Sequence, residues 1–321
     1  MKIIIITQAR YGSSRLPGKV LKRVNGKTLL QIHLERALKA TNAHKLIVAT
    51  TIEKEAEQII AVAQELGLTS YQGSVDDVLD RFYMAAKNEN ADYVVRITSD
   101  CPLIDATIID EVITACIKGG FDYCTNAIEA TYPDGMDVEV IKFSALETAW
   151  KNASLKSDRE HVTPYISRNS TIKRGEPFKA FNYKGKEDFS KYRLTVDEPR
   201  DFEVIRILVE ALGEERGWRD YVDYLTLHSD IFEINSTITR NEGYMKSVEQ
   251  DKLELRSITN FAKSDEYRKK IHNLIPGGAH TYSKGDDQFP ALAPAAISHG
   301  KGAYVWDIDG NKFLDCSMGL T

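Results

Sequence analysis

The chain has 321 residues, of which 42% are hydrophobic and 28% are charged, and its formal net charge is −5. A chain of this length and composition buries one large core or two smaller ones, and its negative charge argues against a surface that binds nucleic acid. The four cysteines show no C-x-x-C spacing and the opening apolar run is short, which excludes a disulfide framework, a signal peptide and a membrane span and leads us to expect a cytoplasmic protein.

Short apolar runs rich in β-branched residues alternate with longer segments of helical period. Strands are predicted at 2–7, 45–50, 93–98 and 121–126, and helices at 28–41, 53–67, 76–90 and 105–118. Later in the chain, strands are predicted at 136–141 and 192–196 and a helix at 200–212. This alternation predicts an α/β fold whose mostly parallel sheet carries helices on both faces, in a first domain that spans residues 1–244.

The composition changes after this domain. Residues 245–263 form a charged stretch with few aromatic residues, which favours a linker or an exposed helix. In the segment that follows, 264–321, the pair Asp309–Gly310 lies between two apolar runs and predicts a hairpin. One hairpin and loops bury too little surface for an independent core, so we interpret 264–321 as the incomplete start of a second domain.

The segment ARYGSSRLPGK, residues 9–19, directly follows the first predicted strand. It therefore lies at the carboxyl edge of the sheet, where open α/β folds bind their ligands. Arg10, Arg15 and Lys19 supply charge that neutralises a polyphosphate, and the glycines let backbone N–H groups approach it. The spacing is neither that of a Walker A loop nor G-x-G-x-x-G. A solvated basic turn is the alternative interpretation.

Two aspartates also follow predicted strands: Asp100 ends RITSD, and Asp197 comes directly after YRLTV. Carboxylate oxygens are the ligands that Mg²⁺ takes beside a triphosphate. Together with the basic loop, the two aspartates therefore predict phosphoryl or nucleotidyl transfer. Asp100 has a structural alternative, because it precedes a Cys–Pro turn, and the nearby Asp105 is an expected helix N-cap.

Six blocks occur in one order along residues 1–240: ARYGSSRLPGKVL, GSVDDVLDRFY, RITSDCPLID, YPDGMDVEV, REHVTPYI and RLTVDEPRDFE. Together they resemble the cytidylyltransferase family that includes spore coat polysaccharide biosynthesis protein F and, more distantly, CMP-Kdo and CMP-sialic acid synthetases. The resemblance implies a GT-A-like (Rossmann-like) nucleotidyltransferase fold, CTP as substrate, and Mg²⁺-dependent formation of a CMP conjugate with loss of pyrophosphate. Ser99 stands where the family more often has glycine, which bears on base choice rather than on phosphate binding.

The resemblance also implies a role for individual residues of the matched blocks. The catalytic residues would be Arg15, Lys19 and Asp100. The nucleotide would be bound by Ala9, Arg10, Gly12, Ser13, Arg15, Lys19, Asp77, Arg81 and Thr98. Magnesium would be held by Asp100 with help from Asp197, and the acceptor by Asp134, Asp137, Glu139 and His161. Taken alone, His161 near a predicted helix start is interpreted as a structural histidine, and Pro133–Gly135 as a turn.

The tail resembles a different family. YRKKIHNLIPGGAHTYSKG and GAYVWDIDGNKFLDCSMGL are similar to the amino-terminal arm of class III aminotransferases, close to glutamate-1-semialdehyde aminomutase. In that family the lysine that binds pyridoxal phosphate lies much further along. Neither pyridoxal phosphate nor aminotransferase activity is therefore expected for this chain, which we interpret as a truncated fusion of the two enzymes.

The expected reaction is transfer of CMP from CTP to a sugar acid, a sugar phosphate or a related phosphorylated or phosphonate acceptor, in surface polysaccharide or glycoconjugate biosynthesis. Two alternatives stay open: a glycosyltransferase that uses a nucleotide sugar, and an inactive nucleotide-binding domain that scaffolds an aminotransferase. The expected partners are CTP and a small-molecule acceptor, with no nucleic acid and no membrane. The sequence leaves a homodimer open.

Overall fold

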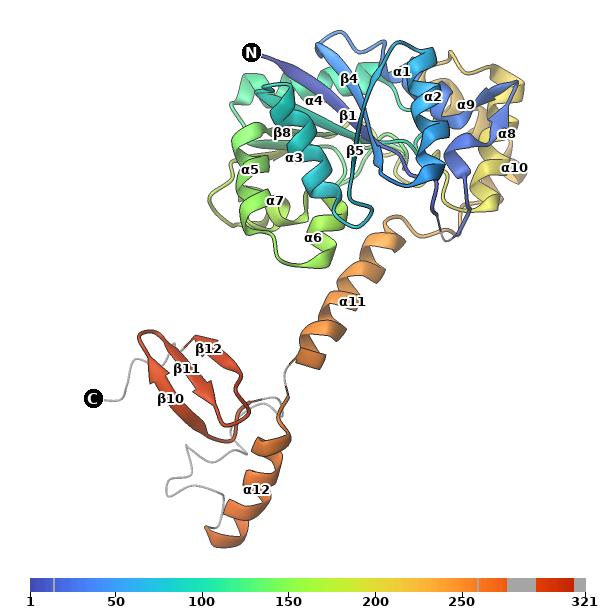
Figure 1. Cartoon of the computed structure of the whole chain (residues 1–321). Helices are drawn as coiled ribbons and strands as arrows, with labels where there is room; N and C mark the ends of the chain where they lie inside the picture. Colours follow the sequence, from blue (N-terminus) through green and yellow to red (C-terminus); the bar gives the residue numbers. More distant parts are fainter. Residues whose placement is uncertain (14, 259, 276–292, 315–321) are drawn as a thin grey trace. The chain divides into compact units, whose positions relative to one another are not determined.

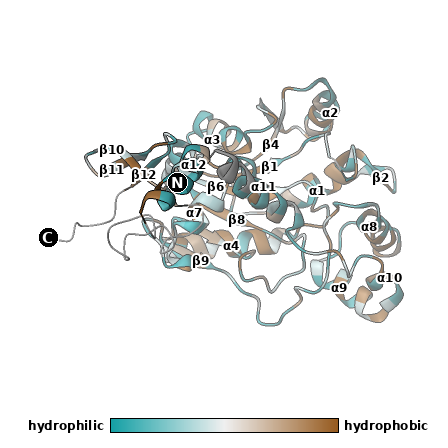
Figure 2. Ribbon diagram, turned by 90° about the horizontal axis from the view of Figure 1, so that it is seen from below, coloured by the Kyte–Doolittle hydropathy of each residue, from teal (hydrophilic) through white to brown (hydrophobic). Residues whose placement is uncertain are grey.

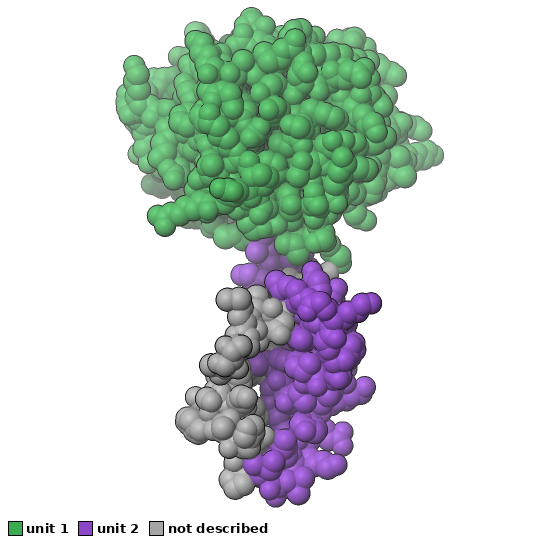
Figure 3. All heavy atoms as spheres, turned by 90° about the vertical axis from the view of Figure 1, so that its left-hand side faces the viewer, with its two compact units in different colours: residues 1–247 green, residues 248–321 purple. Residues whose placement is uncertain are grey.

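The computed structural model describes residues 1–13, 15–258, 260–275 and 293–314, with the side chains of 253–258 left aside. The chain divides into two compact units, residues 1–247 and 248–321, which are green and purple in Figure 3. Parts of the tail blocks, at 276–292 and 315–321, lie outside the described residues.

The first unit is built on a seven-stranded sheet with the strand order β5-β4-β1-β6-β8-β7-β9 (Figure 1). These strands are β1 (Ile3–Gln8), β4 (Lys45–Thr51), β5 (Thr69–Gly73), β6 (Tyr93–Thr98), β7 (Tyr123–Thr125), β8 (Glu139–Lys142) and β9 (Ala180–Asn182), and a separate small hairpin is formed by β2 (Arg23–Val24) and β3 (Lys27–Thr28). β1 pairs in parallel with β4 and β6, β4 with β5, and β7 with β9, whereas β8 is antiparallel to β6 and β7. The prediction of a mostly parallel sheet is confirmed.

The helices of this unit cover both faces of the sheet, as predicted. They are α1 (Leu29–Ala37), α2 (Glu57–Glu65), α3 (Val78–Asn88), α4 (Ala106–Gly119), α5 (Phe143–Asn152), α6 (Lys156–His161), α7 (Pro164–Arg168), α8 (Pro199–Leu212), α9 (Trp218–Leu227) and α10 (Ser229–Glu233), with 3-10 turns at Lys19–Leu21, Lys54–Ala56 and Thr171–Lys173. Successive side chains of a strand point to opposite faces, so Ile3 and Ile5 of β1 enter one core and Ile4 and Ile6 the other. Helices α1, α2, α4, α8 and α9 contribute to the first core and α3, α5 and α7 to the second. Hydrophobic and hydrophilic residues alternate along these helices (Figure 2), as a buried face and a solvent face require.

Two of the predicted strands differ from the structure. The strand predicted at 136–141 begins only at Glu139, because the Asn126 side chain donates to the Met136 carbonyl at 2.7 Å and accepts the Val138 N–H at 2.8 Å. These two backbone groups are thereby bonded to a side chain rather than to a neighbouring strand.

The prediction of a strand at 192–196 is wrong. This segment is extended, but it pairs with a turn: the Leu194 N–H donates to the Asp134 carbonyl at 2.7 Å, and the Asp134 N–H donates to the Tyr192 carbonyl at 2.9 Å. Only an isolated bridge between Asp134 and Arg193 results. Asp197 therefore follows a bridged loop and precedes α8, whose predicted position is confirmed.

The second unit contains α12 (Ala262–Leu274) and an antiparallel sheet of β10 (Ile297–Lys301), β11 (Tyr304–Asp307) and β12 (Lys312–Leu314). The predicted hairpin at Asp309–Gly310 is confirmed, with Gly310 at φ +91°. The Asp309 carboxylate accepts the N–H groups of Lys263 and Ser264 at the start of α12, at 2.6 and 2.8 Å. Helix α11 (Glu242–Ile258) covers much of the segment expected as a linker or exposed helix. Within the described ranges, no helix is both long enough and apolar enough to cross a membrane.

Candidate active site

The loop that follows β1 lies at the carboxyl edge of the sheet, as predicted. The parallel strands β1, β4 and β6 end there, and Ala9 extends the pairing by donating its N–H to the Ala49 carbonyl at 3.0 Å. The loop closes where the Gly18 N–H donates to the Tyr11 carbonyl at 3.0 Å. Gly18 has φ +64°, and a Cβ there would lie 3.2 Å from the Tyr11 ring, so this closure requires glycine.

Lys19 lies between the two predicted metal carboxylates. Its Nζ is 3.0 Å from Asp100 Oδ2 and 2.9 Å from Asp197 Oδ1. Burial disfavours the charge on Lys19, but the attraction of Asp100 and Asp197 outweighs it and raises the pKa of the ammonium. Burial likewise disfavours the Asp100 carboxylate, yet Lys19 holds the pKa of Asp100 well below its usual range. Lys19 and Asp100 are therefore both charged at neutral pH, although they lie far apart in the sequence.

Arg15 lies beside this cluster. Its Nη2 is 3.2 Å from Asp197 Oδ1, and its Nη1 is 3.1 Å from Oε2 of Glu242, the first residue of α11. Arg10 and Gly12 of the same loop are exposed. The cations Arg15 and Lys19 are thus paired with carboxylates that a triphosphate would have to replace.

Three further predicted nucleotide residues make short local contacts. The Ser13 hydroxyl accepts the Leu16 N–H at 3.4 Å, and the Thr98 hydroxyl lies 3.4 Å from the Cys101 sulfur. Asp77 is the N-cap of α3 and accepts the Asp80 N–H at 2.9 Å. These contacts order the edge of the sheet. They do not test the nucleotide-binding role predicted for the three residues, which stays a prediction.

Arg81 is a buried arginine in α3 that lacks most of its partners. Its side chain is 1% exposed, and its Nη2 donates to the Val75 carbonyl at 3.4 Å. Within the described part of the chain, its Nε and Nη1 have no hydrogen-bond partner. Burial and the nearby charge of Arg10 lower the pKa of Arg81 to about 10, so it remains cationic at neutral pH. Such a group is stabilised by an acceptor supplied from outside the chain.

Asp134 and Asp137 lie on the turn before β8 and share a cation. Arg240 pairs with the Asp137 carboxylate, and its Nε is 3.9 Å from Asp134 Oδ1. Burial raises the pKa of both acids, that of Asp137 to about 7, while the Arg240 charge opposes this rise. Asp137 keeps 26% of its side chain exposed, and the neighbouring carboxylates Asp134 and Glu139 add to the effect of burial on its pKa.

Both carboxylate oxygens of Glu139 are bonded to other side chains of the chain. Its Oε1 accepts a hydrogen bond from the Tyr123 hydroxyl, and its Oε2 pairs with Arg96, whose Nη2 is 3.3 Å from the side-chain oxygen of Gln8. Glu139 is buried, with 7% exposure. In this arrangement it holds Arg96 and Tyr123 in place, and contact with an acceptor stays a prediction.

The sequence indicated a position near a helix start for His161, but in the structure His161 is the last residue of α6. Its Nε2 lies 3.1 Å from the Ser247 hydroxyl, which donates to Glu160 at 3.0 Å, and its ring packs edge-on against Tyr244 at 5.2 Å between centroids. Burial lowers the pKa of His161, so the ring is neutral at neutral pH. Arg159, in the same helix, donates from Nε to both Asp77 oxygens at 3.0 Å and so joins two of the six sequence blocks.

The carboxylates of Asp100 and Asp197 fit a magnesium ion. Both are within 3.0 Å of one ammonium, so they face a common point at which a cation is already favourable. Mg²⁺ takes oxygen ligands and is commonly held by one or two carboxylates together with substrate phosphates. Among the described residues there is no group of three or more His, Cys, Asp or Glu side chains that could hold a metal ion by itself.

Sequence reasoning missed Arg96, Arg193 and Arg240. Arg193 is the most connected of them, since it contacts Asp134 and Asp197 at once. Arg96 and Arg193 lie inside the quoted blocks RITSDCPLID and RLTVDEPRDFE. Their position in these blocks could have marked both residues as candidates for the site. Arg240 lies outside every block, and only the folded chain brings it to Asp137.

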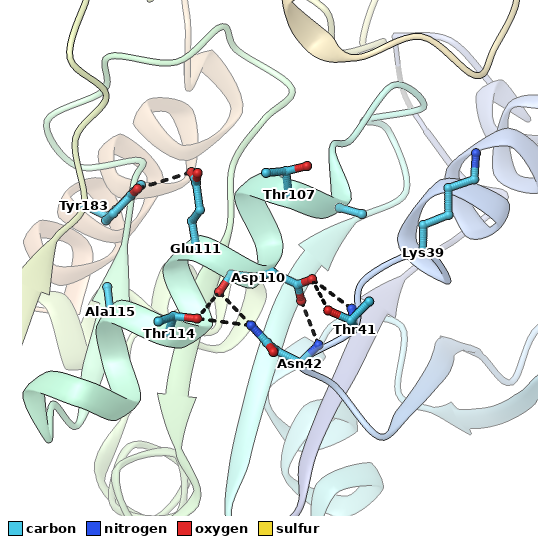
Figure 4. A pocket seen from close by; sticks show the side chains of 10 residues that line it. Lys39, Thr41, Asn42, Thr107, Asp110, Glu111, Thr114, Ala115 and Tyr183 are labelled. Carbon is cyan, nitrogen blue, oxygen red and sulfur yellow. Dashed lines mark hydrogen bonds between the residues drawn. The ribbon is translucent and has the colours of Figure 1, made fainter.

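A surface pocket of about 550 Å³ contains none of the predicted residues (Figure 4). It lies between the loop after α1 and helix α4, where the Asp110 carboxylate accepts the N–H groups of Thr41 and Asn42 at 2.9 and 2.8 Å. On its other side the Tyr183 hydroxyl donates to Glu111 at 3.2 Å. The side chains of Asp110, Glu111 and Tyr183 are thus already bonded within the chain, and the charged edge of the sheet is the better candidate.

Comparison with known proteins agrees with this fold. Residues 4–229 match the family described as Cytidylyltransferase. An uncharacterized protein of Methanocaldococcus jannaschii is 40% identical over 247 residues, which are 76% of this chain and 98% of the relative. Spore coat polysaccharide biosynthesis protein SpsF of Bacillus subtilis is 34% identical over 220 residues, 66% of this chain and 88% of the relative. The structure of a cytidylyltransferase from Leptospira borgpetersenii is similar with a TM-score of 0.69 and 35% identity, over 75% of this chain and 100% of that chain.

Proposed function

The chain belongs to the cytidylyltransferase family, and from this premise we propose that it transfers CMP from CTP to a small-molecule acceptor with release of pyrophosphate. The observation that carries the proposal is the charge cluster at the carboxyl edge of the sheet, where Lys19 lies between Asp100 and Asp197 and Arg15 lies beside them. Family membership favours this nucleotidyl transfer over a glycosyltransferase or an inactive scaffold.

In the proposed reaction an acceptor oxygen forms a bond to the α-phosphorus of CTP, and the bond from this phosphorus to the leaving pyrophosphate oxygen breaks. A hydroxyl acceptor also releases its proton to solvent in this step. The backbone of residues 9–19 and the charges of Arg15 and Lys19 hold the triphosphate and stabilise the charge that develops on pyrophosphate. Asp100 and Asp197 would hold Mg²⁺, which supplies Lewis-acid stabilisation of the phosphate oxygens when it is bound.

Arg81 supports the nucleotide side of the proposal. Its two unpartnered nitrogens are buried in the described structure, which costs free energy unless a ligand brings acceptors to them. CTP carries such acceptors on both its phosphates and its base. We assign Arg81 to nucleotide binding, together with Arg10, whose charge acts on it.

The acceptor side comprises Asp134, Asp137 and His161. Carboxylates and a neutral imidazole bind and orient hydroxyl groups. A sugar acid, a sugar phosphate or a related phosphorylated or phosphonate compound suits this combination beside the cations Arg96 and Arg240. Surface polysaccharide biosynthesis in the cytoplasm is the setting we assign, supported by the similarity to the spore coat polysaccharide biosynthesis protein.

For residues 264–321 we retain the interpretation of a segment similar to the amino-terminal part of a class III aminotransferase. The two tail blocks extend beyond the residues that the structure describes. Within the described part, this segment consists of α12 and the sheet that contains the hairpin. Addition of pyridoxal phosphate to the purified chain should produce no lysine-linked absorbance band.

The first test measures thermal stabilisation by CTP, UTP, GTP and ATP, each with and without Mg²⁺. A nucleotide at a hundred times its dissociation constant stabilises the native state by about 2.7 kcal/mol. We expect a shift selective for CTP that requires Mg²⁺ and is lost in Asp100→Asn. Asp110→Asn, a change in the remote pocket, is the matched control and should keep the shift.

The second test follows pyrophosphate release from CTP in the presence of sugar acids and sugar phosphates. Release that depends on both substrates supports CMP transfer. The absence of a shift with any triphosphate would refute the assignment of residues 9–19, and release with a base other than cytosine would change the nucleotide but keep the chemistry.

A further inference from the structure

Arg193 lies between the two halves of the site. Its side chain is 5% exposed, and it donates from Nη1 to Asp134 Oδ2 at 2.6 Å and from Nη2 to Asp197 Oδ2 at 3.1 Å. Asp134 belongs to the proposed acceptor side and Asp197 to the proposed nucleotide side. One guanidinium therefore connects the two groups of residues directly.

Asp201 holds the other edge of the same guanidinium. Nε and Nη2 of Arg193 donate to its two carboxylate oxygens at 2.8 and 3.0 Å, in the bidentate geometry that favours arginine. Asp201 is fully buried, and its Oδ2 also accepts the N–H groups of Asp197 and Glu198 at 2.9 and 3.0 Å. It thus fixes the backbone of Asp197, while Arg193 fixes the carboxylate of that residue.

Asn235 closes the arrangement from the opposite side. Its Nδ2 donates to the Arg193 carbonyl at 3.2 Å and to Asp201 Oδ1 at 3.1 Å, and the residue is 2% exposed. Burial disfavours the Asp201 carboxylate, but the bonds and charge of Arg193 hold the pKa of Asp201 below its usual range. The pair is therefore ionised, and hydrogen bonds to Asp134, Asp197 and Asn235 restrain its orientation.

The Asp197 carboxylate has one oxygen for each side of the site. Oδ2 accepts from Arg193, so Oδ1 is the oxygen that faces Lys19 Nζ at 2.9 Å and Arg15 Nη2 at 3.2 Å. If the bond to Arg193 were lost, only Lys19 and Arg15, which the proposed function also assigns to the triphosphate, would restrain the last torsion of the carboxylate, which is broad for aspartate. The oxygen offered to a cation would then no longer be defined.

We infer that Arg193 and Asp201 are positioning residues that orient the Asp197 carboxylate toward the triphosphate and tie it to Asp134. Hydrogen-bonded partners behind a metal-binding carboxylate set its orientation and tune metal affinity. This inference rests on the proposed function, because the orientation of Asp197 matters only if the site binds a nucleotide with a divalent cation.

The test compares wild type, Arg193→Lys and Arg36→Lys by titration calorimetry of the full chain with CTP, with and without Mg²⁺. Lysine keeps the charge but cannot span three carboxylates. Arg36 is the matched control, because it is also 5% exposed but donates to the backbone carbonyls of Ile104 and Glu214 and not to the site. We expect Arg193→Lys to weaken CTP binding in Mg²⁺ by about tenfold or more. Without Mg²⁺ the change should be much smaller, and Arg36→Lys should change neither affinity.

Each outcome distinguishes the inference from the proposed function. A folded Arg193→Lys protein that keeps the wild-type ratio of the two affinities, with only a lower melting temperature, would show a merely structural role and overturn the inference. Failure of the wild-type chain itself to bind CTP would overturn the proposed function, and the inference with it.

If Arg193→Lys does not fold, the variant Asn235→Ala tests the inference instead. This variant removes one neutral donor from Asp201 and leaves all the charges in place. Loss of a neutral hydrogen bond predicts about threefold weaker CTP binding in Mg²⁺. Unchanged binding in Asn235→Ala would then count against the positioning role.

Discussion

Replacing Lys19 by methionine removes the ammonium between Asp100 and Asp197 while keeping an unbranched side chain that is one atom shorter. The two contacts of 3.0 and 2.9 Å each correspond to about 5 kcal/mol of attraction at an effective dielectric constant of about 20. The cost of burying Lys19 offsets most of this, and the carboxylates keep 29% and 24% exposure. We therefore expect a net loss of about 2–3 kcal/mol at neutral pH, below the roughly 3–5 kcal/mol for breaking a fully buried pair.

The assay is thermal unfolding followed by circular dichroism, in which a loss of this size lowers the melting temperature by roughly 4–12 °C. The loss should depend on pH. Lys19 depresses the pKa of Asp100, so this contribution is fully present above the ordinary aspartate pKa of 3.8 and fades as the pH falls toward the lower folded value. Wild type and variant should therefore converge in acid.

Magnesium provides the second readout for Lys19→Met. Without the ammonium, Asp100 and Asp197 face a common point with no cation of their own, so Mg²⁺ should stabilise the variant more than the wild type. Lys27→Met is the control, because Lys27 also pairs with two carboxylates, Glu35 and Glu214 at 2.7 and 2.9 Å, but is 33% exposed and remote from the site. It should lose less than about 1 kcal/mol. Equal melting temperatures for Lys19→Met and wild type at neutral pH, or equal responses to Mg²⁺, would refute this reasoning.

Three further predictions concern stability and binding. Arg81→Met removes the buried nitrogens that lack partners, so the ligand-free protein should be as stable as wild type or up to about 1–2 kcal/mol more stable, while calorimetry shows weaker CTP binding; a large loss of stability with unchanged binding would contradict this. Burial raises the pKa of Asp137 to about 7, so its favourable contribution is full below the ordinary value of 3.8 and is lost as the pH rises through 7. In urea titrations at mildly alkaline pH, Asp137→Asn should accordingly be more stable than wild type by about 1–2 kcal/mol, after allowance for the partial exposure of Asp137. In acid it should not be more stable. Equal differences in stability at both pH values would exclude the titration of Asp137 as the cause. Gly135→Ala should cost about 2–3 kcal/mol or more in the same titrations, because Gly135 has φ +105° and a Cβ would lie 2.7 Å from the Leu194 carbonyl carbon; a stability within about 0.5 kcal/mol of wild type would show that the turn adjusts freely.

The sequence predicted the parts of the fold that are encoded locally. Strands such as β1 and β6 are runs of β-branched residues, and in a parallel sheet their ends share one edge, which places the loop 9–19 near Asp100. The strand at 192–196 was wrong because its pattern is that of a strand, yet its backbone bonds to the turn at Asp134. The local sequence pattern of an extended segment does not indicate which part of the chain its backbone will bond to.

The charged network behind the site was the least predictable part. Arg193 and Asp201 are eight residues apart, a separation that indicates no contact on a helix, and their pairing depends on the turn before α8. Arg240 meets Asp137 across 103 positions of the sequence. Such pairs are set by tertiary packing and by the need to neutralise buried charge, neither of which appears in a hydrophobic period.

The central place of β1 has a consequence for how the molecule opens. β1 is bonded on both edges, to β4 and β6, and Ile3–Ile6 enter both cores with at most 4% exposure. Its amide hydrogens should exchange with solvent only when the whole unit unfolds, whereas those of the short edge strand β9 exchange through local fluctuations. The loop 9–19 is thereby attached to the last segment to open. Local opening at the β9 edge should therefore leave that attachment intact.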